Sequence, residues 1–557
     1  MLGALTKQTD GNEPMSHLHF DNPFDRRSFL AAGIGLITAR GEGAWAQGEE
    51  SDASLVEERD LAGLQVALET GKVSSRALVQ AYLDRIEAID RKGPMLNSVI
   101  EVNPEALAIA QELDRERKDK GPRGPLHGIP ILLKDNIATG DRMETTAGSL
   151  ALVGLKPPKD AVVAERLRQA GAVIMGKTNL SEWANARSSN STSGWSGRGG
   201  LTKNPYALDR NPSGSSSGSG AAVAASLCAA AVGTETDGSI LSPASANGVV
   251  GLKPTVGLVS RTGIIPISAS QDTAGPMART VRDAAILLGG MVGNDPDDKA
   301  DLVSSRPDGL PKDYTKALQA GGLKGVRIGV ARNFFNFQEN VDPILAKALE
   351  LLSAEGAVLV DSNDLPKGGS FGGAETIVLY YEMKAGLNAY FATLGPTSPI
   401  RTVEDVLAFN KKNAGRELQY FGQDFLEKVA TRGDLDSKEY KDALARCKRV
   451  TRKEGLDQVM GNLKLDAVVG PCSGPPGVTD LVSGDRSSGG YDLISLAAVA
   501  GYPSISVPAG NLWGLPIAIA FAGRPWSEAT LLKIAYGFEQ AVKARKAPRF
   551  LPTVKQK

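Results

Sequence analysis

The sequence predicts an α/β fold, in which one large domain is built on a central mixed, mostly parallel sheet covered by helices on both faces. The stretch DAVVAERLRQAGAVIMGKTNL, residues 160–180, has the pattern of a helix, a glycine turn and a buried strand. The same alternation recurs at 316–361 and 465–545, and it is typical of a parallel sheet with covering helices. The chain has no internal repeat, and only one Gly/Ser-rich stretch looks like a linker.

Local patterns predict the remaining elements. Residues 54–121 predict amphipathic helices interrupted by a short strand at 96–102. Residues 127–137, HGIPILLKDNI, have an apolar core typical of a strand that ends at Asp-Asn. The region 362–465 is predicted to be helical and irregular, with its strongest helix over 376–395.

Composition excludes some classes of partner. The 557 residues are 42% hydrophobic and 23% charged, which is ordinary for a globular protein. Lys+Arg and Asp+Glu both number 63, so net charge provides no attraction for nucleic acid or for an anionic membrane. No apolar run reaches the length of about 18 residues that a membrane helix needs. We therefore expect no nucleic-acid partner and no stable association with a membrane.

The N-terminus has the features of an export signal. Arg26 and Arg27 precede a short apolar stretch, and Ala44-Trp45-Ala46 has the small-x-small pattern of a cleavage site. Residues 1–46 are therefore predicted to be a twin-arginine-type signal peptide of a bacterial periplasmic protein, with Met15 as a second candidate start. Residues 47–557 are predicted to be the mature domain. The alternative is an ordinary N-terminal helix.

Cysteine and histidine are too scarce for several kinds of site. Cys228, Cys447 and Cys472 are far apart and form no CxxC pair, so neither a disulfide framework nor a metal site is expected. His127 is the one histidine downstream of the predicted signal. Its turn-like context PLHGIP favours a structural role over that of a catalytic base.

The stretch SGSSSGSG, residues 213–220, has the composition of a flexible linker. However, the alanine-rich residues that follow predict a buried helix over 219–232. Such a helix carries the chain about 21 Å, and residues 233–239 can return about 23 Å if extended. Ser215 and Ser239 could therefore lie side by side.

A serine nucleophile needs a base, and a lysine can act as one if burial lowers its pKa. Lys134 is the candidate because it directly follows the apolar stretch IPILL. The alternative is a lysine at the end of a strand whose ammonium reaches water.

Together these segments resemble the amidase signature family of Ser-Ser-Lys hydrolases. The resemblance rests on GIPILLKDNI, SGSSSGSGAAVAA and GTETDGSI, and it extends to QDTAGPMARTVRDAAILLGGMVG and GLPIAIAFAGRPWSEATLLKIAYGFEQA. It covers about residues 54–300 and 465–545, whereas about 301–464 diverge. It implies the amidase signature fold for 47–557.

The resemblance also implies residue roles. Lys134 matches the catalytic lysine, Ser215 the bridging serine on a cis bond after Gly214, and Ser239 the nucleophile. Backbone N–H groups around Thr236, Asp237 and Gly238 would form the oxyanion hole, and Ser216 would hydrogen-bond to Lys134. No metal and no organic cofactor is implied.

The expected substrate is a small-molecule or peptide amide. Asp237 and Leu241 replace a glycine and an arginine that many family members have, which weakens the case for small acidic substrates. The form ETDGSI is most similar to peptide amidases, which deamidate peptide C-termini. Aryl acylamides and simple aliphatic or aromatic amides are the alternatives. The tRNA-dependent amidotransferase component that amidates misacylated tRNA and a catalytically silent binding protein are less expected.

Four aromatic residues on the helix of the divergent region allow two interpretations. Tyr380, Tyr381, Tyr390 and Phe391 could form a wall of the substrate pocket. Plain core packing is the expected alternative. The oligomeric state is not indicated by the sequence.

Overall fold

The computed structural model describes residues 55–486 and 488–554. The predicted signal peptide, 1–46, lies outside the described residues and stays a prediction. Contacts along the chain group Glu50–Lys557 into one unit.

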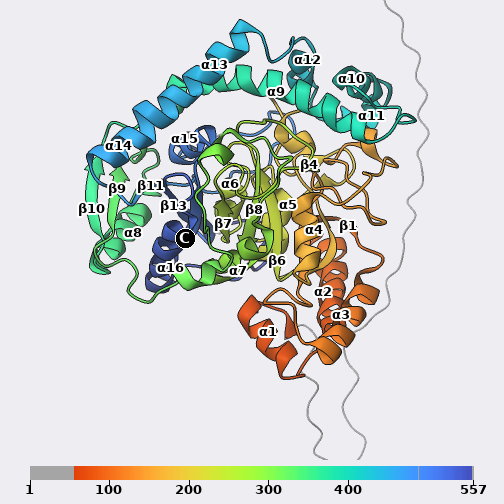
Figure 1. The fold of residues 1–557 in the computed structure, drawn as a ribbon, viewed down its shortest axis with the longest axis horizontal. Helices are drawn as coiled ribbons and strands as arrows, with labels where there is room; N and C mark the ends of the chain where they lie inside the picture. The colour runs from red at the N-terminus through yellow and green to blue at the C-terminus, as the bar shows by residue number, and fades with distance from the viewer. Residues whose placement is uncertain (1–54, 487, 555–557) are drawn as a thin grey trace, which may run out of the picture. The chain divides into compact units, whose positions relative to one another are not determined.

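An eleven-stranded sheet forms the centre of this unit (Figure 1). In spatial order its strands are β1 (Val99–Val102), β3 (Val173–Thr178), β2 (Pro130–Lys134), β6 (Ala230–Glu235), β8 (Thr273–Ala278), β7 (Val250–Lys253), β12 (Ser504–Leu512), β13 (Leu515–Ala522), β11 (Ala467–Pro471), β9 (Arg327–Ala331) and β10 (Val358–Ser362). A separate two-stranded ribbon joins β4 (Trp195–Ser196) to β5 (Gly200–Leu201). The predicted α/β class with one large mixed sheet is confirmed.

Antiparallel pairing is more extensive than the sequence predicted. The parallel pairs lie in two blocks, β3–β2–β6 and β11–β9–β10, and the six other neighbouring pairs are antiparallel. The strands in the helix–strand alternations at 160–180 and 316–361 do pair in parallel with neighbouring strands. The alternation at 465–545 instead contains a hairpin, because Trp513 and Gly514 adopt left-handed backbone conformations that turn β12 directly into β13.

Helices flank the sheet. Helices α5 (Ser217–Ala224) and α6 (Leu241–Ala246) contact each other and pack on β6 and β7, respectively, while α15 (Asp492–Ala500) packs on β11 and β13. A second contiguous set consists of α4 (Val162–Gln169), α7 (Val281–Met291), α16 (Glu528–Val542) and α8 (Asp342–Ala354). The N-terminal helices are α1 (Leu61–Glu69), α2 (Ser75–Arg85) and α3 (Ala106–Lys120).

The buried helix predicted over 219–232 is wrong in extent. Helix α5 ends at Ala224, and residues 230–235 form the central strand β6. A continuous apolar run fits a strand buried on both faces as well as it fits a buried helix, so the pattern could not separate them. The chain reverses at Ser226, which has a φ of 54°, and Arg279 Nη1 donates hydrogen bonds to the carbonyls of Val223 and Cys228 around this turn.

The region 362–465 is mostly helical, as predicted. Its helices arch over the top of the view in Figure 1 and are α9 (Gly372–Thr393), α10 (Val403–Lys412), α11 (Ala414–Glu417), α12 (Asp424–Ala430), α13 (Lys438–Lys448) and α14 (Asp457–Asn462). Helices α9 and α13 pack side by side.

The four aromatic residues of α9 are core residues. Tyr380 packs edge-on against Phe425, with ring centroids 4.7 Å apart. Tyr381 contacts Tyr440 and donates a hydrogen bond to Glu439. Tyr390 and Phe391 are buried in a cluster that includes Trp183. These four residues therefore pack in the core, which is the second of the two interpretations that the sequence allowed.

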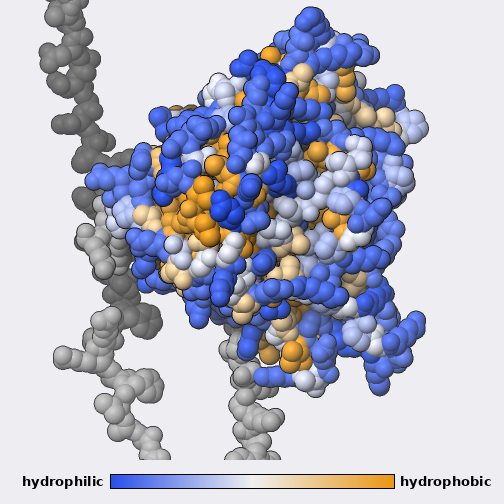
Figure 2. Space-filling view, turned by 60° about the vertical axis from the view of Figure 1, so that its left-hand side comes forward, coloured by the Kyte–Doolittle hydropathy of each residue, from blue (hydrophilic) through white to orange (hydrophobic). Residues whose placement is uncertain are grey.

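Hydrophilic residues cover most of the face in Figure 2, and apolar residues gather in one part of it. Among the described helices, none combines the length and the apolar character that crossing a bilayer requires.

Candidate active site

Lys134 ends strand β2, which lies between β3 and β6 in the sheet, and it is fully buried. Its Nζ lies 2.8 Å from Ser215 Oγ, 2.9 Å from Thr234 Oγ1 and 3.2 Å from the Thr234 carbonyl oxygen. Burial lowers the pKa of Lys134 to about 7, although the carboxylates of Asp272 and Glu235 oppose the decrease. Lys134 can therefore be a neutral amine near neutral pH.

The three contacts match the bonding capacity of a neutral amine. A neutral amine has two N–H donors and one lone pair. The two oxygens of Thr234 can accept both N–H groups, which leaves the lone pair to accept a proton from Ser215 Oγ. Asn136 Nδ2 donates to Thr234 Oγ1 at 3.0 Å and holds this hydroxyl in place. Neither Thr234 nor Asn136 was predicted from the sequence.

Ser215 lies in the loop before α5, and the peptide bond between Gly214 and Ser215 is cis, as the resemblance implied. The next residue, Ser216, brings the loop against the second serine, because its backbone N–H donates to the Ser239 carbonyl oxygen at 3.2 Å. Ser215 and Ser239 are thus neighbours, as the chain lengths between them allowed.

Ser216 does not bond to Lys134 as expected. Its hydroxyl donates to the Thr234 carbonyl at 3.0 Å and accepts the Thr234 N–H at 3.2 Å. The backbone of β6 meets the start of α5 here, so Ser216 and Lys134 share the Thr234 carbonyl as acceptor. Ser216 therefore hydrogen-bonds to Thr234, which is the partner of Lys134, and not to Lys134 itself.

Ser239 ends a tight loop between β6 and α6. Gly238 has a φ of 75°, a left-handed conformation that glycine adopts readily. Glu235, at the end of β6, accepts the N–H groups of Ile240 and Leu241 at 2.7 and 3.0 Å, which fixes the start of α6. Leu241 is fully buried.

The backbone N–H groups within this loop are available to a ligand. Within the described chain, the N–H groups of Asp237, Gly238 and Ser239 donate to no other protein group. Several free N–H groups beside a hydroxyl form the arrangement that stabilises a developing oxyanion. The predicted residues Thr236, Asp237 and Gly238 lie at this loop.

Two cavities border the loop. One, of about 690 Å³, is lined by Gly214, Asp237 and Gly238 and by the segment from Ser473 to Asp480. The other, of about 220 Å³, is lined by Asn136, Thr234 and Thr236 and by an apolar wall that includes Ile264–Ile267. Neither of these two cavities is lined by Tyr380, Tyr381, Tyr390 or Phe391.

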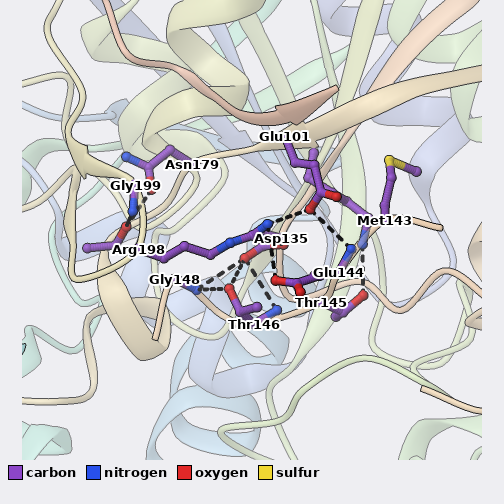
Figure 3. Close-up of polar contacts among 12 residues, drawn as sticks. Glu101, Asp135, Met143, Glu144, Thr145, Thr146, Gly148, Asn179, Arg198 and Gly199 are labelled. Atoms are coloured by element: carbon purple, nitrogen blue, oxygen red, sulfur yellow. Dashed lines mark hydrogen bonds and ion pairs between the residues drawn. The ribbon is translucent and has the colours of Figure 1, made fainter. Parts of the chain in front are cut away.

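A buried charge network holds the chain where it leaves β2 (Figure 3). Asp135 accepts hydrogen bonds from the Thr146 hydroxyl and from the Gly148 N–H, and Arg198 Nη1 lies 3.3 Å from its carboxylate. Arg198 also pairs with Glu101 at 2.5 Å and with Glu144 at 3.3 Å. Burial raises the pKa of Asp135, and Arg198 opposes this effect. The network thus fixes the residue next to Lys134.

We predict that Arg198→Met lowers the free energy of unfolding by about 3 kcal/mol, because the buried Asp135 and two partly buried glutamates lose their cationic partner. The matched control is Arg115→Met, because the Arg115–Glu112 pair has side-chain exposures of 62% and 67% and should contribute less than about 1 kcal/mol. Urea denaturation measures both. Equal losses in the two variants would contradict the role of the network.

His127 has the structural role that its sequence context favoured. Its Nδ1 accepts the Arg123 N–H at 3.2 Å, and its Nε2 lies 2.9 Å from the Leu113 carbonyl. Both ring nitrogens are therefore occupied by backbone groups, and the histidine is buried away from the serines.

Comparisons with known proteins add four similarities. A family model described as "Amidase" matches residues 77–532. A probable amidase of Arabidopsis thaliana is 44% identical over 508 residues, which are 89% of this chain and 92% of that protein. A glutamyl-tRNA(Gln) amidotransferase component of Halorhodospira halophila is 36% identical, over 87% of this chain and 97% of that protein. The crystal structure of native peptide amidase from Stenotrophomonas maltophilia is 49% identical with a TM-score of 0.83, and the match covers 89% of this chain and 99% of that chain.

Proposed function

The chain belongs to the amidase signature family and is an amidase, and from this premise we propose that it hydrolyses the C-terminal amide of peptides through an acyl-enzyme on Ser239. The observation that carries the mechanism is the contact of 2.8 Å between Lys134 Nζ and Ser215 Oγ, in a loop that adjoins Ser239. Lys134, Ser215 and Ser239 are the proposed triad.

In the proposed reaction, Ser239 Oγ attacks the carbonyl carbon of the amide. Its proton passes to Ser215 Oγ, whose own proton passes to the lone pair of Lys134. The N–H groups of the loop after Thr236 stabilise the oxyanion. Collapse of the tetrahedral intermediate breaks the C–N bond, and the proton returns through Ser215 to the leaving nitrogen, which departs as ammonia. Water then cleaves the ester by the same route and yields the carboxylic acid and free Ser239.

The larger cavity supports the choice of a peptide substrate. Its volume of about 690 Å³ is enough for an acyl group of more than one residue. The wall from Ser473 to Asp480 offers backbone groups for a peptide chain, and Val478, which is 62% exposed, offers apolar surface for a side chain. The identity of 49% to the Stenotrophomonas peptide amidase supports the same choice.

A panel of substrates tests the proposal with purified enzyme. An amidated dipeptide is expected to have the highest kcat/KM, above an acyl anilide and a short aliphatic amide. If the anilide is preferred, the enzyme is an aryl acylamidase. If the amidated peptide is the poorest substrate of the three, the peptide proposal is wrong while the amidase assignment stands.

The activity is expected to depend on pH through Lys134. Because the base must be neutral and its pKa is about 7, kcat/KM should fall about tenfold per unit below that pH. Asp272 raises the pKa of Lys134. Asp272→Asn should therefore move the acidic limb of the pH–rate profile to lower pH. Initial rates between about pH 5 and about pH 9 measure it. A limb that stays in place or moves to higher pH would contradict the assignment of the base.

A further inference from the structure

Asp237 is in an unusual place for a carboxylate. It lies two residues before Ser239, in the loop whose N–H groups are free, and it is one of the residues that line the larger cavity. Hydrolysis of the substrate amide leaves a new carboxylate on the acyl product, next to Ser239. The carboxylate of Asp237 therefore attracts or repels any charged group of a ligand in this cavity.

Two helices from the second half of the chain hold Asp237. Ser495 Oγ, on α15, donates a hydrogen bond to Asp237 Oδ2 at 3.1 Å. Glu375, on α9, shares a hydrogen bond with Asp237. On the far side of Glu375, Gln271 Nε2 donates to Glu375 Oε1 at 3.0 Å and to the Thr236 carbonyl at 3.2 Å. The position of Asp237 is therefore defined by its neighbours.

A hydrogen bond between two carboxyl groups requires a proton on one of them. Burial raises the pKa of both, and the charge of Asp237 raises that of Glu375 further, to well above its ordinary value. The proton of this hydrogen bond is assigned to Glu375, which leaves Asp237, the acceptor of the Ser495 hydroxyl, as the anionic member. In this assignment the negative charge of the pair is on Asp237, which lines the cavity.

That charge has no cation within ion-pair distance among the described residues. The buried Lys253 lowers the pKa of Asp237, but its Nζ donates to the Pro254 carbonyl. Arg486 also lines the cavity, but it is an exposed residue whose charge solvent screens. The cavity next to the reacting carbonyl is therefore electrically negative.

We propose that Asp237, held by Glu375 and Ser495, is a specificity residue that rejects acyl groups with a carboxylate near the scissile amide. The same charge repels the newly formed acid and favours its departure. The proposal rests on the proposed function, because it concerns the acyl side of that site. It extends the function to a rule: neutral and cationic acyl groups are accepted, and anionic ones are not.

Three substrates of nearly equal size test this rule. They are the α-amides of N-acetyl-asparagine, N-acetyl-aspartic acid and N-acetyl-2,4-diaminobutyric acid, whose side chains are neutral, anionic and cationic. With the wild-type enzyme, kcat/KM for the anionic amide should be at least about tenfold below the neutral one, from one unit charge at close range. Equal rates for the neutral and the anionic amide would overturn the proposal without any variant.

Variants at Glu375 and Asp237 distinguish an effect of the charge on Asp237 from an effect on the structure of the loop. Glu375→Gln keeps an N–H donor to Asp237 and the single negative charge, so the ratio of neutral to anionic kcat/KM should stay. Asp237→Asn combined with Glu375→Gln removes the charge and should lower that ratio by about tenfold. Inhibition by N-acetyl-asparagine, the acid product of the neutral amide, should become correspondingly stronger. A double variant that keeps the wild-type ratio would overturn the proposal. If the wild-type enzyme hydrolyses none of the three amides, the proposed peptide amide function fails instead.

Discussion

Ser239→Ala is expected to lower kcat/KM for amide hydrolysis by about 10⁴-fold or more, because it removes the atom that attacks the carbonyl. The fold should survive, since Ser239 contributes a backbone carbonyl to Ser216, and alanine keeps it. Steady-state rates and a thermal unfolding curve measure the two effects.

Ser219→Ala is the matched control for this loss. Ser219 lies in the Gly/Ser-rich stretch 213–220 that also contains Ser215, is fully buried and bonds to Thr178 and to the Val232 carbonyl. Its loss should leave kcat/KM within a few-fold of wild type. Substantial turnover by the Ser239 variant, at rates that contaminating enzyme cannot explain, would contradict the nucleophile assignment.

Lys134→Met should produce a loss of similar size, about 10³-fold or more, because the shape remains but the base is gone. Raising the pH should not restore the activity, since methionine cannot be deprotonated. Rates across the pH range, with circular dichroism to check folding, measure the result.

Lys177→Met tests whether activity depends on Lys134 as the base or on any buried lysine. Lys177 lies on the neighbouring strand β3, is also fully buried, and burial lowers its pKa to about 8. However, its Nζ donates to the Ile137 carbonyl and to Thr145 Oγ1 and not to a serine of the site. The variant should lose stability through these two bonds, while its folded fraction keeps near-normal kcat/KM. If both lysine variants lose activity equally, Lys134 has no special role.

Much of the site could be predicted from sequence, for two different reasons. The proximity of Ser215 and Ser239 followed from the lengths of chain that lead away and return. The route was wrong, since α5 ends at Ala224 and the strand begins at Ala230. The two serines are still close, because a shorter helix and an earlier strand also bring the chain back to the Ser216 N–H, which bonds to the Ser239 carbonyl. The roles of Lys134, Ser215 and Ser239 came from the family resemblance, because no spacing rule identifies a lysine base.

Other parts could not be predicted because their partners are distant in sequence. Thr234 accepts from a lysine 100 residues earlier, and Glu375 reaches Asp237 from the divergent region. No local pattern marks either residue. The resemblance of the Gly-Thr-Glu-Thr stretch to the family assigns no role to the hydroxyl of Thr234. Similarly, the antiparallel hairpin β12–β13 depends on the left-handed turn at Trp513 and Gly514, which is a weak signal in sequence.

In the proposed reaction, Ser239 carries the acyl group. The most direct measurement is mass spectrometry of enzyme treated with a fluorophosphonate, a reagent that traps activated serines, followed by peptide mapping. We expect one adduct, on Ser239, whose rate of formation falls below about pH 7 as Lys134 becomes protonated and which is absent in Ser239→Ala. An adduct on Ser215 or on another residue, or equal labelling of the Ser239→Ala variant, would contradict the claim.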